Sequence, residues 1–196
     1  MVVSVSFATM SKANGSCTLS QVGAVDVSWT AYKTPAKLGV GGTFNQVTFK
    51  AAAPSGTNFK QIFVGATLLI QTDSVNSNNS ARDAKLVQFF FDKMVSKTIE
   101  GKIIGYTAGA REKGKPKTGV FTVAITMNKV TKNIPMNFSY FEGVLEVSGV
   151  IDVFDFKAQE ALNAINKACF ELHKGKTWSD VSIGFKTQIK AVCNPK

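Results

Sequence analysis

The sequence contains little of the side-chain chemistry on which enzymes depend. It has one histidine, His173, so a Ser-His-Asp triad could assemble only around that residue. Its three cysteines are widely separated, with neither a Cys-x-x-Cys pair nor Cys/His spacing, which argues against a zinc site. It contains neither a Walker loop nor the glycine fingerprint of dinucleotide-binding folds. We therefore expect no catalytic residue, no metal site and no cofactor.

Long apolar runs are also missing. No run is long enough to cross a bilayer as a helix, and no linker divides the 196 residues into separate parts. We expect a single domain over residues 17–196. Residues 1–16 are interpreted as the remnant of an export signal or as a disordered N-terminus. The segment Met1–Ala8 is mildly apolar but lacks the basic n-region of a complete secretory signal.

Positive charge is abundant, and the formal net charge of +10 favours an acidic partner. The lysines are spread along the chain, with the densest basic group in the Gly/Pro-rich segment 111–117. This segment is either a solvated hairpin tip or a patch that makes transient contact with anionic headgroups at a membrane surface. Because it has no interleaved aromatic residues for base stacking, we expect no nucleic-acid partner.

Most of the chain follows the period-two alternation of half-buried β-strands. Apolar and polar residues alternate in segments 25–31, 121–128, 134–140, 145–153 and 181–190. Short connections that contain Gly, Asn or Pro allow neighbouring strands to pair antiparallel. About eight such strands are enough to close a barrel. The sequence therefore predicts an all-β fold, an elongated eight-stranded antiparallel barrel.

Two segments interrupt the strands with helical patterns. Apolar residues recur at helical spacing from Lys157 to His173, and Gly175 stands at the expected C-terminal cap, which predicts one long covering helix. His173 is expected to be structural, because a cation suits the last turn of a helix. Ser80, followed three residues later by Asp83, predicts the N-cap of a short helix.

Several short motifs follow one another in a specific order along most of the chain. They are Val25-Asp26-Val27-Ser28-Trp29-Thr30-Ala31-Tyr32-Lys33, Gly41-Gly42-Thr43-Phe44, Asp73-Ser74-Val75, Asn79 with Arg82-Asp83, Leu86 and Phe90-Phe91, Gly101-Lys102, the segment from Gly119 to Val130 with Thr131-Lys132, and a late segment from Ala161 through His173-Lys174-Gly175-Lys176-Thr177-Trp178 to Val181. In this order they resemble the YceI-like family of lipocalin-like bacterial proteins.

The resemblance implies a lipocalin-like barrel that holds a long-chain amphiphile, such as a polyisoprenoid or a fatty-acyl compound. It also implies export to the periplasm or beyond, and often a homodimer. A chain of roughly 15 or more carbons is needed, since a buried CH₂ contributes about 0.8 kcal/mol against an association cost of about 4–15 kcal/mol. The leading hypothesis is a non-catalytic binding protein. The alternatives are an enzyme that acts on a lipid in the barrel, and a secreted structural or adhesive barrel with a filled core.

The residues expected to line such a cavity are apolar side chains on adjacent strands, most of them of shared parity. They are Trp29, Phe44, Leu68, Ile70, Ile103, Phe121, Val123, Ile125, Met127, Phe138, Leu145, Val147, Ile151, Ile183 and Phe185. Gly101, Gly105 and Gly149 share the inward parity and either permit curvature or leave room for a ligand. Arg82 either supports the short helix with Asp83 or contacts a phosphate or carboxylate headgroup.

The three cysteines allow one disulfide bond. In a closed up-and-down barrel the first and last strands pair antiparallel, which would bring Cys17 beside Cys193. An oxidising compartment outside the cytoplasm would permit this bond. Two free thiols, or a bond to Cys169, remain the alternatives. Cys169 is on the apolar face of the expected helix, so it should be a buried free thiol.

Overall fold

The computed structural model describes residues 17–194, so the interpretation of residues 1–16 concerns a segment outside the described residues. The elements are β1 (Cys17–Lys33), β2 (Leu38–Phe44), β3 (Val47–Lys50), α1 (Phe59–Phe63), β4 (Thr67–Gln71), η1 (Thr72–Ser74), β5 (Val75–Asn76), α2 (Ser80–Phe89), η2 (Phe91–Lys93), β6 (Thr98–Ala108), β7 (Lys117–Met127), β8 (Val130–Phe141), β9 (Val144–Asp152), η3 (Val153–Phe156), α3 (Gln159–Ala168), α4 (Phe170–His173) and β10 (Thr177–Cys193).

The strands form one curled antiparallel sheet in the order β3-β4-β6-β7-β8-β9-β10-β1-β2-β5. The all-β class and the curled antiparallel architecture are confirmed, with ten strands among residues 17–194 instead of eight. The additional strands include β3 and β5, which are four and two residues long, too short to show an alternation in sequence. They are also the two edges of the sheet.

The curl brings these edges together because β2 and β3 are almost continuous in the chain. Only Asn45 and Gln46 separate them, so one stretch of chain pairs with β5 through β2 and with β4 through β3. The backbone N–H of Asn45 donates to the carbonyl of Ser74 at 2.8 Å, and that of Gln71 donates to the carbonyl of Gln46 at 3.1 Å. These two bonds extend the β3–β4 and β2–β5 pairings toward each other, although β3 and β5 do not pair with each other.

The inner face of the sheet carries the predicted apolar residues. Along β7, Phe121, Val123, Ile125 and Met127 are buried, while the residues between them are partly exposed. This follows from the pleat, which points successive side chains to opposite faces. The same alternation buries Ile134, Met136 and Phe138 on β8.

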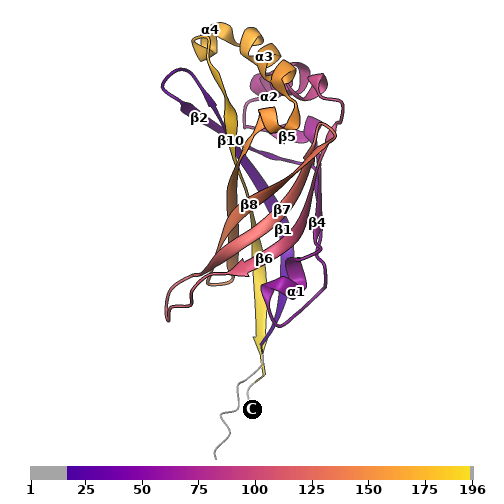
Figure 1. Ribbon diagram of the computed structural model, residues 1–196, viewed down its shortest axis with the longest axis vertical. Coiled ribbons are helices and arrows are strands. Elements are labelled where there is room, and N and C mark those ends of the chain that lie inside the picture. The colour runs from indigo at the N-terminus through magenta and orange to yellow at the C-terminus, as the bar shows by residue number, and fades with distance from the viewer. Residues whose placement is uncertain (1–16, 195–196) are drawn as a thin grey trace, which may run out of the picture.

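The helices cover the two ends of the elongated sheet. Figure 1 shows α2, α3 and α4 gathered at one end, and α1 at the opposite end. We call these the helical end and the α1 end. The connection between β6 and β7, which contains the basic segment 111–117, also lies away from the helical end (Figure 1).

Two helix predictions need correction. The N-cap of α2 is Asn79 and not Ser80, because the Asn79 side chain accepts the hydrogen bond from the backbone N–H of Arg82. The predicted helix from Lys157 to His173 is divided into α3 and α4 at Cys169, whose ψ of 22° departs from helical geometry. Helical periodicity continues across such a break, so the sequence pattern does not reveal it.

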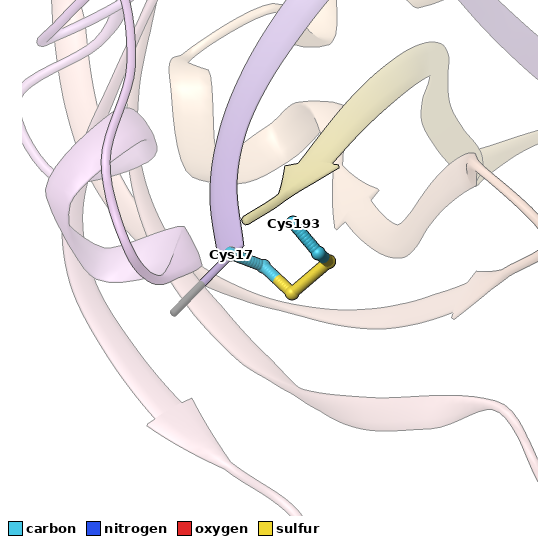
Figure 2. Close-up of a disulfide and its surroundings, with 2 residues drawn as sticks. All are labelled: Cys17 and Cys193. Atoms are coloured by element: carbon cyan, nitrogen blue, oxygen red, sulfur yellow. A yellow bond between two sulfur atoms is a disulfide. The ribbon is translucent and has the colours of Figure 1, made fainter. Parts of the chain in front are cut away.

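The first and last strands pair along most of their length, as predicted. Cys17 lies directly opposite Cys193 in the β1–β10 register, and a disulfide bond joins them. Figure 2 shows this bond at the start of β1 and the end of β10. Cys169 is a buried free cysteine, which confirms its prediction. The β1–β10 pair lies inside the sheet order, so the bond links two interior strands and does not lie at the edges.

None of the helices formed by residues 17–194 is both long and apolar enough to cross a membrane.

Candidate functional site

A cavity of about 470 Å³ lies inside the curled sheet and extends to the helical end. Its walls come from strands throughout the sheet, including β1, β4, β6, β7 and β10, and its cover comes from α2, α3 and α4. Most of the lining side chains are apolar. A volume of this size falls within the usual range for small-molecule sites, about 300–1,000 Å³.

Most of the predicted wall residues line this cavity. They are Trp29, Phe44, Leu68, Ile70, Ile103, Val123, Ile125, Met127, Ile151, Ile183 and Phe185. Their position follows from the two-residue period of each strand, because alternate side chains point to the inner face of the sheet although the sheet is curled. The cavity is therefore built largely from residues that the alternation identifies.

Four predicted wall residues lie elsewhere. Phe121, Phe138, Leu145 and Val147 face the interior but do not line the main cavity. They belong to a packed core toward the α1 end, where the rings of Phe121 and Phe138 are 4.8 Å apart. Parity identifies the inner face correctly for these residues, but it does not distinguish a filled part of the interior from an open part.

Helix α1 explains why this part is filled. Its buried Phe63 ring lies 5.6 Å from the ring of Phe121, and its Phe59 ring lies 5.8 Å from that of Phe138. Sequence analysis missed α1 because five residues are too few to show a helical period. One local signal was present: Asn58 precedes the helix and accepts a hydrogen bond from the backbone N–H of Gln61, as N-cap residues do.

The three inward-parity glycines have different surroundings. A Cβ on Gly101 would meet only ordinary contacts with Leu68 and Val123, and Gly101 lines the cavity. A Cβ on Gly149 would lie 3.0 Å from Cγ of Met136, which occupies that space. A register shift between Ile103 and Gly105 breaks the parity, so Gly105 lies against Thr122. Only Gly101 leaves room in the cavity.

Arg82 has a structural role and also lines the cavity. Its Nε donates to the hydroxyl of Ser77 and its Nη2 to the carbonyl of Ser77, both at 2.7 Å. The Asp83 carboxylate accepts hydrogen bonds from the backbone N–H and the hydroxyl of Ser77. The two side chains therefore hold the chain before α2, while Arg82 remains part of the cavity wall.

Apart from Arg82, the charged and titratable residues that line the cavity at the helical end carry no signal in the periodic pattern of the sequence. Lys33 at the end of β1, Lys85 in α2, and His173 in α4 all line the cavity and are half-buried. Together with Arg82 we call them the cationic mouth. Lys33, Lys85 and His173 are distant in sequence and share no motif, so only the fold brings them to one place. The presence of a single histidine was a weak signal for His173.

Hydrogen bonds fix the orientation of the His173 ring. The Thr177 hydroxyl donates its hydrogen to Oδ1 of Asn166 at 2.8 Å, so it accepts a hydrogen bond from Nδ1 of His173 at 2.7 Å. This assigns the ring proton to Nδ1 and leaves Nε2 unprotonated in the neutral form. Burial lowers the pKa of His173 below its ordinary value of 6.5, and the positive charges of Lys33 and Lys85 lower it further.

The arrangement suits binding of an apolar chain. Across residues 17–194, no group of three His, Cys, Asp or Glu side chains could hold a metal ion. Within the same part of the chain, every buried side-chain nitrogen or oxygen has a hydrogen-bond partner. The lining thus offers a large apolar surface with one polar end, which matches the two parts of an amphiphile.

Known proteins share this fold at low sequence identity. A polyisoprenoid binding domain from Saccharophagus degradans, implicated in plant cell wall breakdown, has 13% identity and a TM-score of 0.54, with 91% of this chain and 100% of that chain covered. BcnA from Burkholderia cenocepacia has 13% identity and a TM-score of 0.52, with 85% and 96% covered. The YCEI protein of Campylobacter jejuni has 17% identity and a TM-score of 0.51, with 80% and 86% covered.

At the sequence level, no curated protein gives a significant match. The family model described as YceI-like domain matches residues 13–190, which is most of the chain. Together with the fold, this match establishes that the chain belongs to the YceI-like family.

Proposed function

We propose that this protein is a non-catalytic carrier or store for a long-chain amphiphile, held in the cavity inside the sheet. The observation that supports this most strongly is the apolar cavity of about 470 Å³, with one polar end. One structural relative is described as a polyisoprenoid binding domain, which favours a polyisoprenoid or a fatty-acyl compound as the ligand class.

The rival hypotheses predict different behaviour. An enzyme would need reacting groups held together near the ligand. The lining includes Cys169, Glu100 and His173, but Nδ1 of His173 is bonded to Thr177 and not to a carboxylate that would activate it as a base. A structural barrel would have a filled interior, and only the α1 end is filled in this way. The open part of the interior therefore favours a binding role.

Native mass spectrometry of the purified protein tests the proposal. We expect an apolar molecule to copurify and to be released when the protein is denatured. Delipidated protein should bind an added long-chain lipid and return it chemically unchanged. A protein that stays empty when lipid is offered would contradict the proposal, and so would steady turnover of the lipid.

The disulfide bond between Cys17 and Cys193 supports a periplasmic or secreted location. Such bonds form and persist in oxidising compartments and are rare in the cytosol. Fractionation of cells that express the native gene would test this. Recovery with cytosolic markers, with both thiols reduced, would contradict it. The homodimer implied by the family resemblance stays a prediction, which sedimentation equilibrium would test.

Transient contact with a membrane would allow the ligand to enter at the helical end. Leu172 lines the cavity and is also 62% exposed, and its neighbour Phe170 is 55% exposed. The exposed Lys174 and Lys176 follow in the chain, and lysines are attracted to anionic lipid surfaces. The basic segment 111–117 lies away from this end, so it is poorly placed for this contact (Figure 1).

Cosedimentation with phosphatidylglycerol vesicles tests this contact. Replacing Phe170 and Leu172 by serine should reduce vesicle binding several-fold, because both side chains would otherwise insert among the acyl chains. Val150→Ser removes a side chain of similar exposure (58%) from β9 and serves as the matched control. Equal loss in the control and in the double variant would contradict a contact at the helical end.

A further inference from the structure

The cationic mouth places positive charge at one end of an apolar cavity. Lys33, Lys85 and His173 come from β1, α2 and α4, and all three line the same cavity as Ile125 and Phe185. Arg82 lines it too, but its Nε and Nη2 are already bonded to Ser77. These bonds hold the Arg82 guanidinium against Ser77, whereas Lys33 and Lys85 have no such tie among the described residues, so the proposal rests on the two lysines and His173.

Within the described part of the chain no ion pair joins these groups to a carboxylate, although Glu100 also lines the cavity. The ion pairs found between residues 17 and 194 join Lys37 to Asp180, Lys97 to Asp92, Lys115 to Glu112, Lys132 to Asp155, and Lys186 to Glu146. Lys33, Lys85 and Arg82 take part in none of them. Half-buried positive charges without counter-ions favour an anion, because burial reduces the screening by water.

We propose that Lys33, Lys85 and His173 bind the anionic headgroup, a carboxylate or a phosphate, of an amphiphile whose chain occupies the cavity. This rests on the proposed function, since it names the chemical class of the ligand for the same cavity. The lysine ammonium groups act as point charges that suit either oxyanion. The Nε2 atom of His173 supplies the third contact.

His173 gives the proposal a distinctive consequence. Its ring donates through Nδ1 to Thr177, so Nε2 must gain a proton before it can donate to an oxyanion. Without a ligand, Lys33 from β1 and Lys85 from α2 oppose that proton. The charged neighbours of His173 in the chain, Glu171 two residues before it and Lys174 directly after it, are both exposed. An anion at the mouth reverses the balance, so binding is accompanied by proton uptake near neutral pH.

Calorimetry with delipidated protein and three ligands of equal chain length tests the headgroup contact. Palmitate and hexadecyl phosphate should bind about tenfold more tightly than hexadecanol, which corresponds to about 1.4 kcal/mol. The double variant Lys33→Gln/Lys85→Gln should lose most of this preference while its affinity for hexadecanol is unchanged. Lys102→Gln/Lys113→Gln, which removes the same charge from two exposed positions, should keep the preference.

The outcomes separate the two proposals. Equal binding of all three ligands to the wild-type protein would overturn the headgroup proposal and leave the carrier function standing. Failure of every ligand to bind would overturn both. Inorganic phosphate alone is the further probe. If it binds at the mouth while the two anionic lipids show no advantage over hexadecanol, the site belongs to a free anion and the headgroup proposal is wrong.

Titrations in two buffers of different ionisation enthalpy measure the proton uptake. When palmitate binds, the wild-type protein should take up protons, and the His173→Gln substitution should remove most of that uptake. Hexadecanol should bind without uptake. Unchanged uptake in the His173→Gln protein would overturn the role of His173.

Discussion

Neighbouring residues on one strand of this sheet have opposite surroundings. Ile125 on β7 lines the cavity, whereas Ala124 lies on the outer face opposite Lys102 of β6. A substitution can therefore change the cavity while the adjacent position on the same strand serves as its control. This makes the cavity accessible to single-residue tests.

Ile125→Glu should abolish lipid retention and lower stability, because a carboxylate without a partner would enter an apolar cavity. Ala124→Glu adds the same charge on the outer face beside Lys102 and should retain lipid. Copurified lipid is measured by native mass spectrometry. Since Ile125→Glu can also prevent folding, Gly101→Leu provides a second variant that fills the cavity without adding charge. Full retention in folded Ile125→Glu and Gly101→Leu proteins would place the ligand outside the cavity.

The lowered pKa of His173 predicts a pH dependence of stability in the absence of ligand. The unfolded chain binds a proton at this residue more readily than the folded chain, so acid favours unfolding. The contribution of the neutral His173 ring to the free energy of unfolding is complete above about pH 6.5 and is lost as the pH falls below that value. Urea denaturation measures the free energy of unfolding at about pH 7.5 and about pH 5.5. The decrease of this free energy between the two pH values should be smaller for His173→Gln than for the wild-type protein. An equal decrease in both proteins would assign the dependence to other groups.

At the scale of elements, α1 and the β1–β10 pair determine how the interior is divided. Helix α1 fills its end of the interior through Phe59 and Phe63, which pack on Phe121 and Phe138. The disulfide bond ties the start of β1 to the end of β10. The α1 end is therefore filled and tied by the disulfide bond, whereas the cavity extends to the helical end.

Phe59→Ala should destabilise the protein by about 3–5 kcal/mol, the usual cost of removing a buried phenylalanine. Its ring lies 5.0 Å from that of Tyr140, so several aromatic contacts are lost together. Lipid affinity should change little in protein that remains folded, because Phe59 does not line the cavity. Chemical denaturation and lipid titration measure the two effects. A large loss of affinity with little loss of stability would show that α1 belongs to the ligand site.

Reduction of the disulfide bond should lower the free energy of unfolding by up to about 5 kcal/mol in the chain-entropy model, because 176 residues separate the cysteines. Cys17→Ser/Cys193→Ser should match the reduced wild-type protein and no longer respond to reductant. Cys169→Ala, which changes the buried free thiol, should still respond. A wild-type protein with the same stability in both redox states would contradict the prediction.

At the scale of the whole molecule, the proposed ligand would act as part of the interior. The cavity leaves apolar wall residues without packing partners on one side, which reduces their dispersion contacts. A bound chain would restore those contacts and link α2 and α3 to the strands below them. Under the proposed function, folding stability and ligand binding would therefore be coupled.

Removal of the lipid should lower the apparent stability, because stabilisation by a ligand rises with the logarithm of its free concentration relative to its dissociation constant. A ligand at 100 times its dissociation constant stabilises the folded state by about 2.7 kcal/mol. Thermal unfolding of delipidated protein, with and without added palmitate, measures this shift. Inorganic phosphate at the same concentration controls for binding of an anion without a chain. No shift with any long-chain ligand would contradict occupancy of the cavity.

The sequence by itself determined the all-β class, the inward face of most long strands and the pairing of the first strand with the last. These features depend on a period of two residues and on chain order, which are local properties. The same reasoning identified Trp29, Ile125 and Phe185 as wall residues. It also placed Cys17 beside Cys193.

Only the tertiary structure decided where the interior is open and where it is filled. Phe121 and Val123 have the same parity on β7, yet Phe121 packs against Phe63 of α1 whereas Val123 faces the cavity. The cationic mouth likewise depends on Lys33, Lys85 and His173, which meet through the curl of the sheet and the docking of α2 and α4. Contacts between segments far apart in the chain leave no periodic signal, because each side chain satisfies its local pattern whichever partner it later meets.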